Sequence, residues 1–130
     1  MYLIEANINS TEPSFNSTIQ LGTNQLKINY AVPISKSTRN ITIYQVNGTN
    51  VIMRQTKSGL ECKVDPDHNS TLLIDVLSST FNSPNSEYHV SIDSNFIKGD
   101  INDEPILGLD PSIWKLYTGI YLFIIHIIFS

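Results

Sequence analysis

Alternation between apolar and polar side chains recurs along most of the chain. In residues 26–32 every second side chain is large and apolar, and Pro33 follows. A repeat of two residues is typical of a half-buried β-strand, and proline ends such a strand because it has no N–H to donate. The same repeat runs through residues 87–93 and residues 112–118. We therefore predict strands in all three segments.

Two hairpins are predicted between these strands. The dipeptide Asn47-Gly48 separates two β-rich runs, and Asn-Gly readily supplies the two positive φ angles of a type I′ turn. This predicts a hairpin made of residues 41–46 and 51–56. The turn-forming residues 65–69 predict a second hairpin, whose return strand covers residues 71–77.

The elements together predict an all-β protein, an Ig-like antiparallel β-sandwich of about seven short strands without a helical interlude. Composition agrees, because 47 of the 130 residues are Ile, Val, Thr, Tyr, Phe or Trp, whereas 32 are good helix formers. A helix bundle is therefore disfavoured. The length predicts a single domain, which we expect over residues 17–118, after an approach segment or first strand in residues 1–16. Residues 3–8 are the candidate first strand.

The last segment, residues 119–130, is an apolar tail. From Ile120 to Phe129 only Tyr121 and His126 interrupt the apolar run. A bilayer-spanning helix needs about 20 such residues, so membrane contact through this run is doubtful. A weak anchor, a glycolipid-attachment signal, an added edge strand and translated non-coding sequence remain open. We expect the tail to lie outside the domain, as the truncated or misread end of a longer gene.

Charge and cysteine content exclude several classes of function. The chain has 12 acidic and 8 basic residues, so it offers no positive field to a phosphate backbone, and nucleic-acid binding is disfavoured. The single Cys62 permits no internal disulfide and no thiolate metal cage. Because it shares a strand face with Leu60 and Val64, we interpret Cys62 as a buried thiol. The sequence as written begins without a recognisable secretory signal.

Three runs carry a resemblance to a known family: QLKINYAVPIS in residues 25–35, EYHVSIDSNFI in residues 87–97 and WKLYT in residues 114–118. Residues 17–118 resemble the SbsA-type Ig-like domain of bacterial surface-layer and adhesin-like proteins. The resemblance implies a Greek-key sandwich and no catalytic residues. It also implies inner-facing side chains on an early strand, the penultimate strand and the last strand, namely Ile28, Tyr30, Tyr88, Val90, Ile92, Trp114 and Leu116.

Asparagine sequons are the most frequent candidate feature. The sequence contains 13 Asn and 25 Ser or Thr residues, and five Asn-x-Ser/Thr sequons occur, about twice the number expected by chance. Ordinary composition and glycan attachment on a secreted surface are both open interpretations. The possible N-glycosylation sites are Asn9, Asn16, Asn40, Asn47 and Asn69.

No catalytic, metal or cofactor residues are predicted. The acidic groups of residues 65–67 and 100–104 do not match calcium-loop spacing, because Pro105 occupies the position that requires Gly. The three His residues share no ligand-like spacing, and no Ser or Cys lies in a nucleophile turn. Turn formation explains the acidic residues better than metal binding does.

These observations predict a non-enzymatic structural or adhesive binding module of a secreted or cell-surface protein. Its expected partner is a protein or a cell-wall glycan. A carbohydrate-binding module is the alternative, for which Tyr44 and Tyr117 are the outward aromatic candidates. An enzyme is the third possibility, and it lacks a cluster of titratable groups at a usable spacing.

Overall fold

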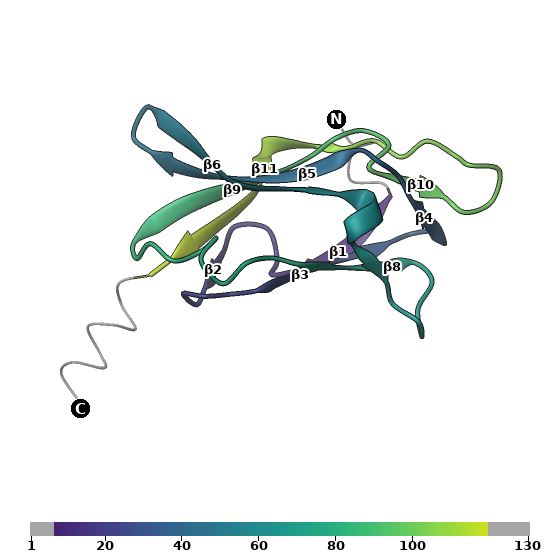
Figure 1. The fold of residues 1–130 in the computed structure, drawn as a ribbon, viewed down its shortest axis with the longest axis horizontal. Coiled ribbons are helices and arrows are strands. Elements are labelled where there is room, and N and C mark those ends of the chain that lie inside the picture. The colour runs from purple at the N-terminus through teal and green to yellow at the C-terminus, as the bar shows by residue number, and fades with distance from the viewer. Residues whose placement is uncertain (1–6, 120–130) are drawn as a thin grey trace.

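Two facing sheets make up the part of the chain that the computed structural model describes, residues 7–119 (Figure 1). The strands are β1 (Ile8–Glu12), β2 (Ser17–Ile19), β3 (Gln25–Tyr30), β4 (Ile34–Lys36), β5 (Asn40–Asn47), β6 (Asn50–Ser58), β7 (Lys63–Val64), β8 (Thr71–Asp75), β9 (Ser86–Ile92), β10 (Ile97–Gly99) and β11 (Leu109–Thr118). One sheet has the order β1-β3-β8-β7 and the other the order β2-β11-β9-β5-β6, and β10 pairs with β4. The described residues contain one 3-10 turn, η1 (Gly59–Glu61).

The core lies between the two sheets and is built from alternate residues of the longer strands. In β3 the burial pattern follows the apolar repeat, so Leu26 and Ile28 are fully buried. In the opposite sheet Trp114 and Leu116 of β11 are equally buried. Burying each such side chain contributes about 1.5–3 kcal/mol to stability. The inner-facing residues implied by the family resemblance are therefore all confirmed as core residues.

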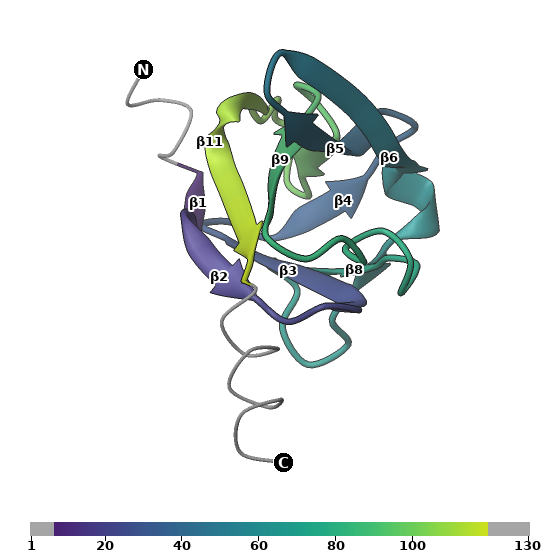
Figure 2. The same ribbon diagram turned by 90° about the vertical axis from the view of Figure 1, so that its left-hand side faces the viewer.

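The N-terminal segment connects the two layers. β1 pairs with β3 in one sheet, and β2 then pairs in parallel with β11 in the other sheet. Figure 2 shows this crossing on the side where β1, β2 and β11 meet. Between the two strands the Pro13 carbonyl accepts a hydrogen bond of 3.1 Å from Trp114 Nε1. The crossing therefore fixes the largest core side chain to both layers.

The all-β prediction is confirmed, and the sequence-based strand count was too low. Eleven strands stand in the described residues where about seven were expected. The additional strands include β2, β4 and β10, which have three residues each. Such short strands contain too few residues to show a repeat of two, and their partners define them.

The first hairpin is confirmed, but its predicted turn type is wrong. β5 and β6 pair antiparallel, with Asn47 opposite Asn50. The two central turn residues are thus Gly48 and Thr49, and of these Gly48 alone has a positive φ, +64°. That arrangement is typical of a type II′ turn, since Asn47 remains in the strand ladder.

Three local predictions also need correction. Leu60 does not share a buried strand face with Cys62, because it lies in η1 and is exposed. The return strand of the second hairpin ends at Asp75 rather than at residue 77. Of the candidate first strand, residues 3–8, Ile8 begins β1.

Several sequence-based interpretations fall beyond the described range. Residues 1–6 and residues 120–130 lie outside the described residues. The prediction that the apolar run from Ile120 to Phe129 is not part of the domain therefore stays a prediction. No helix in residues 7–119 is long and apolar enough to cross a membrane.

Candidate binding surface

The outward face of the five-stranded sheet carries the most distinctive side chains. Residues that pair across neighbouring strands point to the same face, so the pairings define rows. Trp114 and Val90 are paired and buried, so they face the core. Successive side chains of a strand point to opposite faces, so the next pair, Lys115 and His89, faces outward. One outward row contains Met53, Tyr44, His89 and Lys115, and the next contains Val51, Val46, Glu87 and Tyr117.

A β-bulge at Arg54 divides β6 into two parts. Ile43 pairs with Gln55, but the next residue Tyr44 pairs with Met53, so Arg54 is the extra residue. A bulge of this kind bends and twists its strand. The β5–β6 tip, defined here as residues 44–53, lies on the far side of the bulge and projects beyond the core at the end of the sandwich (Figure 1).

The part of β6 that follows the bulge is fixed to the other layer. Gln55 Oε1 accepts hydrogen bonds from Leu77 N at 3.1 Å and Thr80 Oγ1 at 2.6 Å. Lys57 Nζ donates to the Asp75 carbonyl at 2.6 Å. The Arg54 guanidinium donates to the Ser79 carbonyl and to Asn82 Oδ1, both at 2.8 Å. Residues 75–82 therefore cover one side of this half of the strand.

The β5–β6 tip is apolar and exposed. The exposed fractions of Val51, Ile52 and Met53 are 62%, 47% and 60%. Val51 and Met53 lie on the outward face, and Ile52 points to the opposite face because it pairs with Gln45. Three consecutive large apolar side chains at a free sheet edge are unusual, since natural proteins protect such edges. The tip is therefore the leading candidate for contact with another molecule.

A polar pair separates the two outward tyrosines. His89 Nε2 lies 2.5 Å from Glu87 Oε2, and both residues belong to β9, the strand between β5 and β11. Tyr44 pairs with His89, and Tyr117 pairs with Glu87. The two tyrosines thus lie two strands apart on one face, with hydrogen-bonding groups between them.

The five predicted glycosylation sites are spread over the molecule, and all five asparagines are exposed. Asn9 lies in the edge strand β1, Asn40 and Asn47 are the first and last residues of β5, and Asn69 lies in the turn before β8. Asn16 precedes β2 and has a φ of 58°. The exposure of each side chain is compatible with glycan attachment, which stays a prediction.

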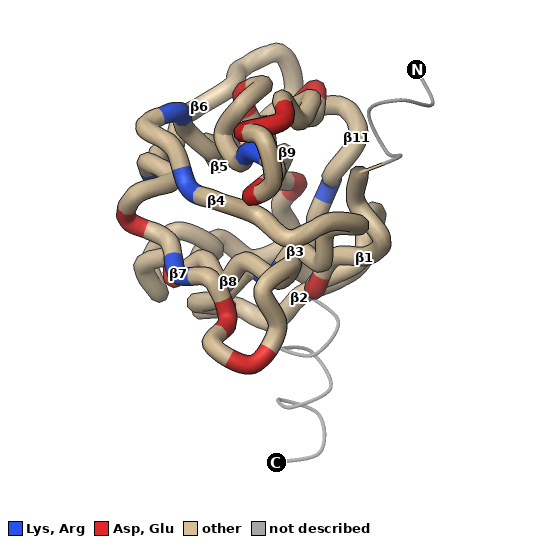
Figure 3. Tube along the Cα trace, turned by 90° about the vertical axis from the view of Figure 1, so that its right-hand side faces the viewer, with Lys and Arg blue, Asp and Glu red and all other residues tan. Residues whose placement is uncertain are grey.

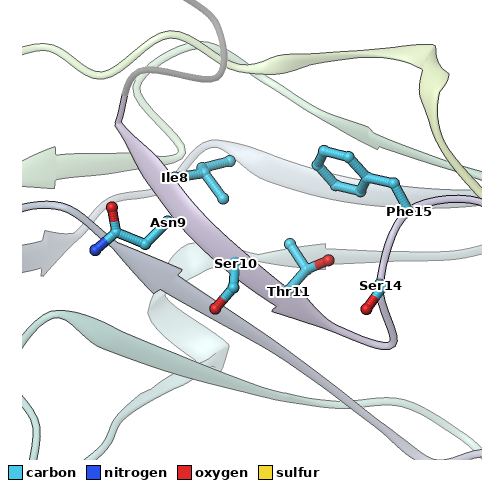
Figure 4. A pocket seen from close by; sticks show the side chains of 6 residues that line it. All are labelled: Ile8, Asn9, Ser10, Thr11, Ser14 and Phe15. Atoms are coloured by element: carbon cyan, nitrogen blue, oxygen red, sulfur yellow. The ribbon is translucent and has the colours of Figure 1, made fainter.

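A groove of about 300 Å³ lies beside β1 (Figure 4). Its lining consists of Ile8, Asn9, Ser10, Thr11, Ser14 and Phe15. Phe15 packs on Trp114 with ring centroids 5.9 Å apart, so it belongs to the rim of the core. Because none of these side chains titrates, the lining offers no general acid or base.

The acidic groups considered for metal binding lie in separate loops (Figure 3). In the turn before β8 the pKa of Asp65 is lowered, mainly because the Asp67 N–H donates to its carboxylate at 3.0 Å. Nowhere in residues 7–119 do three or more His, Cys, Asp or Glu side chains gather closely enough to hold a metal ion. The Asp65 carboxylate thus stabilises its own turn, whereas the Asp103 carboxylate lies 3.5 Å from Lys98 Nζ.

Cys62 is buried, as expected, and its thiol is difficult to ionise. Burial is the main cause that raises its pKa to about 11. The neighbouring Tyr30 hydroxyl also has a raised pKa, again chiefly through burial. A thiol of this kind is a poor nucleophile at neutral pH, because the thiolate is the reactive form.

These raised pKa values predict loss of stability at alkaline pH. The Cys62 thiol ionises near its ordinary pKa of about 9 in the unfolded chain but near 11 in the folded chain. The unfolded state therefore releases its proton first, and the free energy of unfolding should fall as pH rises from about 9 to about 11. Urea unfolding at four pH values will measure this. A Cys62→Ala variant should lose the part of the fall below pH 10, and equal slopes in both proteins would contradict the interpretation.

Comparison with known proteins supports the fold. No protein-family model matches the chain, and no curated protein matches it. Among solved structures it is similar to the crystal structure of CopC from Methylosinus trichosporium OB3b, with a TM-score of 0.59 and 12% sequence identity. The match covers 87% of this chain and 92% of that one. At this identity the likeness concerns the fold alone, and it supports an Ig-like β-sandwich.

Proposed function

We propose that this chain is a non-enzymatic binding module of a secreted or cell-surface protein, with a structural or adhesive role. The observation that supports the proposal is the β5–β6 tip, where three consecutive large apolar side chains are exposed at a free sheet edge. Exposed apolar surface of this kind marks sites of interaction. The family resemblance points the same way, and we propose that the domain is of the SbsA type.

An extracellular setting agrees with the exposed sequon asparagines. The proposed partner is a protein or a cell-wall glycan; nucleic acid does not fit the acidic composition. No cofactor or metal enters the proposal.

An array of secreted and cell-surface proteins, printed beside a glycan array, tests the proposal. The variant Val51→Ser with Met53→Ser should bind protein spots at least tenfold more weakly than the wild type, because it removes apolar area from the tip. Leu77→Ser is the matched control, since Leu77 is 63% exposed and lies outside the tip, where its backbone N–H contacts Gln55 after the bulge. A general hydrolase screen should be negative. Equal binding by the variant and the wild type would contradict the proposal.

A carbohydrate-binding module is the second candidate, supported by the outward tyrosines. Tyr44 and Tyr117 can stack on the apolar faces of sugar rings, while Glu87 and His89 between them can bond hydroxyl groups. Binding to glycan spots that Tyr117→Ala abolishes and the tip variant leaves intact would favour this candidate over the first.

A further inference from the structure

The four outermost strands of the two large sheets differ in length and protection. β1, β2 and β7 have five, three and two residues, whereas β6 has nine. Short edge strands offer little template for pairing, and long ones need charges, proline or a bulge for protection. The bulge at Arg54 protects the middle of β6, and residues 75–82 cover one side of its second half. Its first half, Asn50 to Met53, keeps a free edge.

The tip also lacks charge. All ten residues 44–53 are uncharged, and none is proline. Charges at an edge repel a second copy and orient a different partner. Since the tip carries no charge, no electrostatic repulsion opposes pairing with a second identical strand. A different protein likewise finds no charge here by which to orient itself.

We propose that two copies of this chain pair through the first half of β6, antiparallel and about a two-fold axis at Ile52. This deepens the proposed function, on which it rests, by naming the partner of the tip. Ile52 then lies opposite its equivalent on one face, and Val51 lies opposite Met53 of the second copy on the other. The charged Arg54 lies opposite Asn50, so no like charges meet. Each exposed apolar side chain finds an apolar partner.

The expected strength follows from the size of the contact. Five residues from each copy, Asn50 to Arg54, bury less than the roughly 1,000 Å² that stable interfaces need. The dimer should therefore be weak and dependent on concentration. A two-fold contact closes on itself, so association should stop at the dimer.

Disulfide trapping of the full chain tests the axis. Directly opposed antiparallel residues have Cα atoms about 4.5–5.5 Å apart, within reach of a disulfide. Ile52→Cys should therefore form an intermolecular disulfide under mild oxidation at least ten times faster than Leu77→Cys, a more exposed position off the strand. Cys62 is buried and common to both variants. Val51→Cys alone should crosslink slowly, because its opposite residue is Met53.

Equal rates for Ile52→Cys and Leu77→Cys, or faster trapping of Val51→Cys, would overturn the two-fold pairing. Sedimentation equilibrium supplies a measurement without oxidation, in which Met53→Lys should raise the dimer dissociation constant at least tenfold. The outcomes separate the two proposals. If the tip variant loses array binding but Ile52→Cys forms no intermolecular disulfide, self-pairing is rejected and the binding module is kept. If Ile52→Cys forms the disulfide but the tip variant binds the array as the wild type does, the tip is rejected as a site for other proteins.

Discussion

Replacing Trp114 with alanine should lower the free energy of unfolding by about 3–5 kcal/mol, the range typical of large aromatic residues truncated in a core. The indole is fully buried and packs against Phe15. Its Nε1 also donates to the Pro13 carbonyl, so the substitution removes a hydrogen bond between the two layers as well as apolar contact. Domains of this size have a total stability of about 5–15 kcal/mol, so the loss is a large fraction.

Urea unfolding followed by circular dichroism will measure the effect, since Trp114 is the single tryptophan and fluorescence would vanish with it. His89→Ala is the control on the neighbouring strand. Its side chain lies on the outward face, so its removal should cost less than about 1 kcal/mol. Similar losses in the two variants would mean that the inner and outer faces of the sheet are wrongly assigned.

Replacing Gly108 with alanine should destabilise the fold by about 3 kcal/mol or more, at the upper end of the cost of overpacking. A Cβ atom at this position would lie 1.9 Å from the Ile92 carbonyl oxygen and 2.6 Å from the carbonyl carbon of Asp93. Both are backbone atoms, so no side-chain rotation can make room. The end of β9 and the start of β11 would have to separate.

Gly48→Ala provides the comparison, because it tests backbone conformation without a clash. Gly48 has a φ of +64°, and a Cβ there would meet nothing within 4 Å. Its cost should be the strain of the left-handed conformation, about 1–2 kcal/mol. Thermal melts of both variants will compare the two costs, and an equal or smaller loss at Gly108 would show that β9 and β11 can shift apart freely.

The strands that could be predicted from the sequence are those long enough to show their period. β3, β9 and β11 each bury alternate residues over six or more positions. β4 and β10 could not be predicted, because three residues contain no period and their pairing with each other joins distant segments. The turn η1 did leave a signal. Ser58 and Glu61 form a reciprocal capping box, a pattern of Ser followed three residues later by Glu that marks a helical start.

The candidate binding surface was only partly predictable. The outward position of Tyr44 and Tyr117 followed from alternation and is confirmed by their pairing with β9 residues. The exposed β5–β6 tip was missed, because Val51, Ile52 and Met53 read as an ordinary apolar strand. Their unbroken apolar run within a hairpin was the available signal. Whether such a run is buried or exposed depends on what covers the edge, which is a property of the fold and not of the local sequence.

The position of β11 has a consequence for how the chain acquires its structure during synthesis. β11 is the last described strand to be made, yet it lies between β2 and β9. Its Trp114 reaches back 101 positions to Pro13. A growing chain that ends before Leu109 therefore has β2 without a partner, β9 paired with β5 alone, and an unfilled centre. The β5–β6 hairpin, whose strands are adjacent in sequence, can form early, but the sandwich cannot close on the ribosome until β11 has emerged from the exit tunnel.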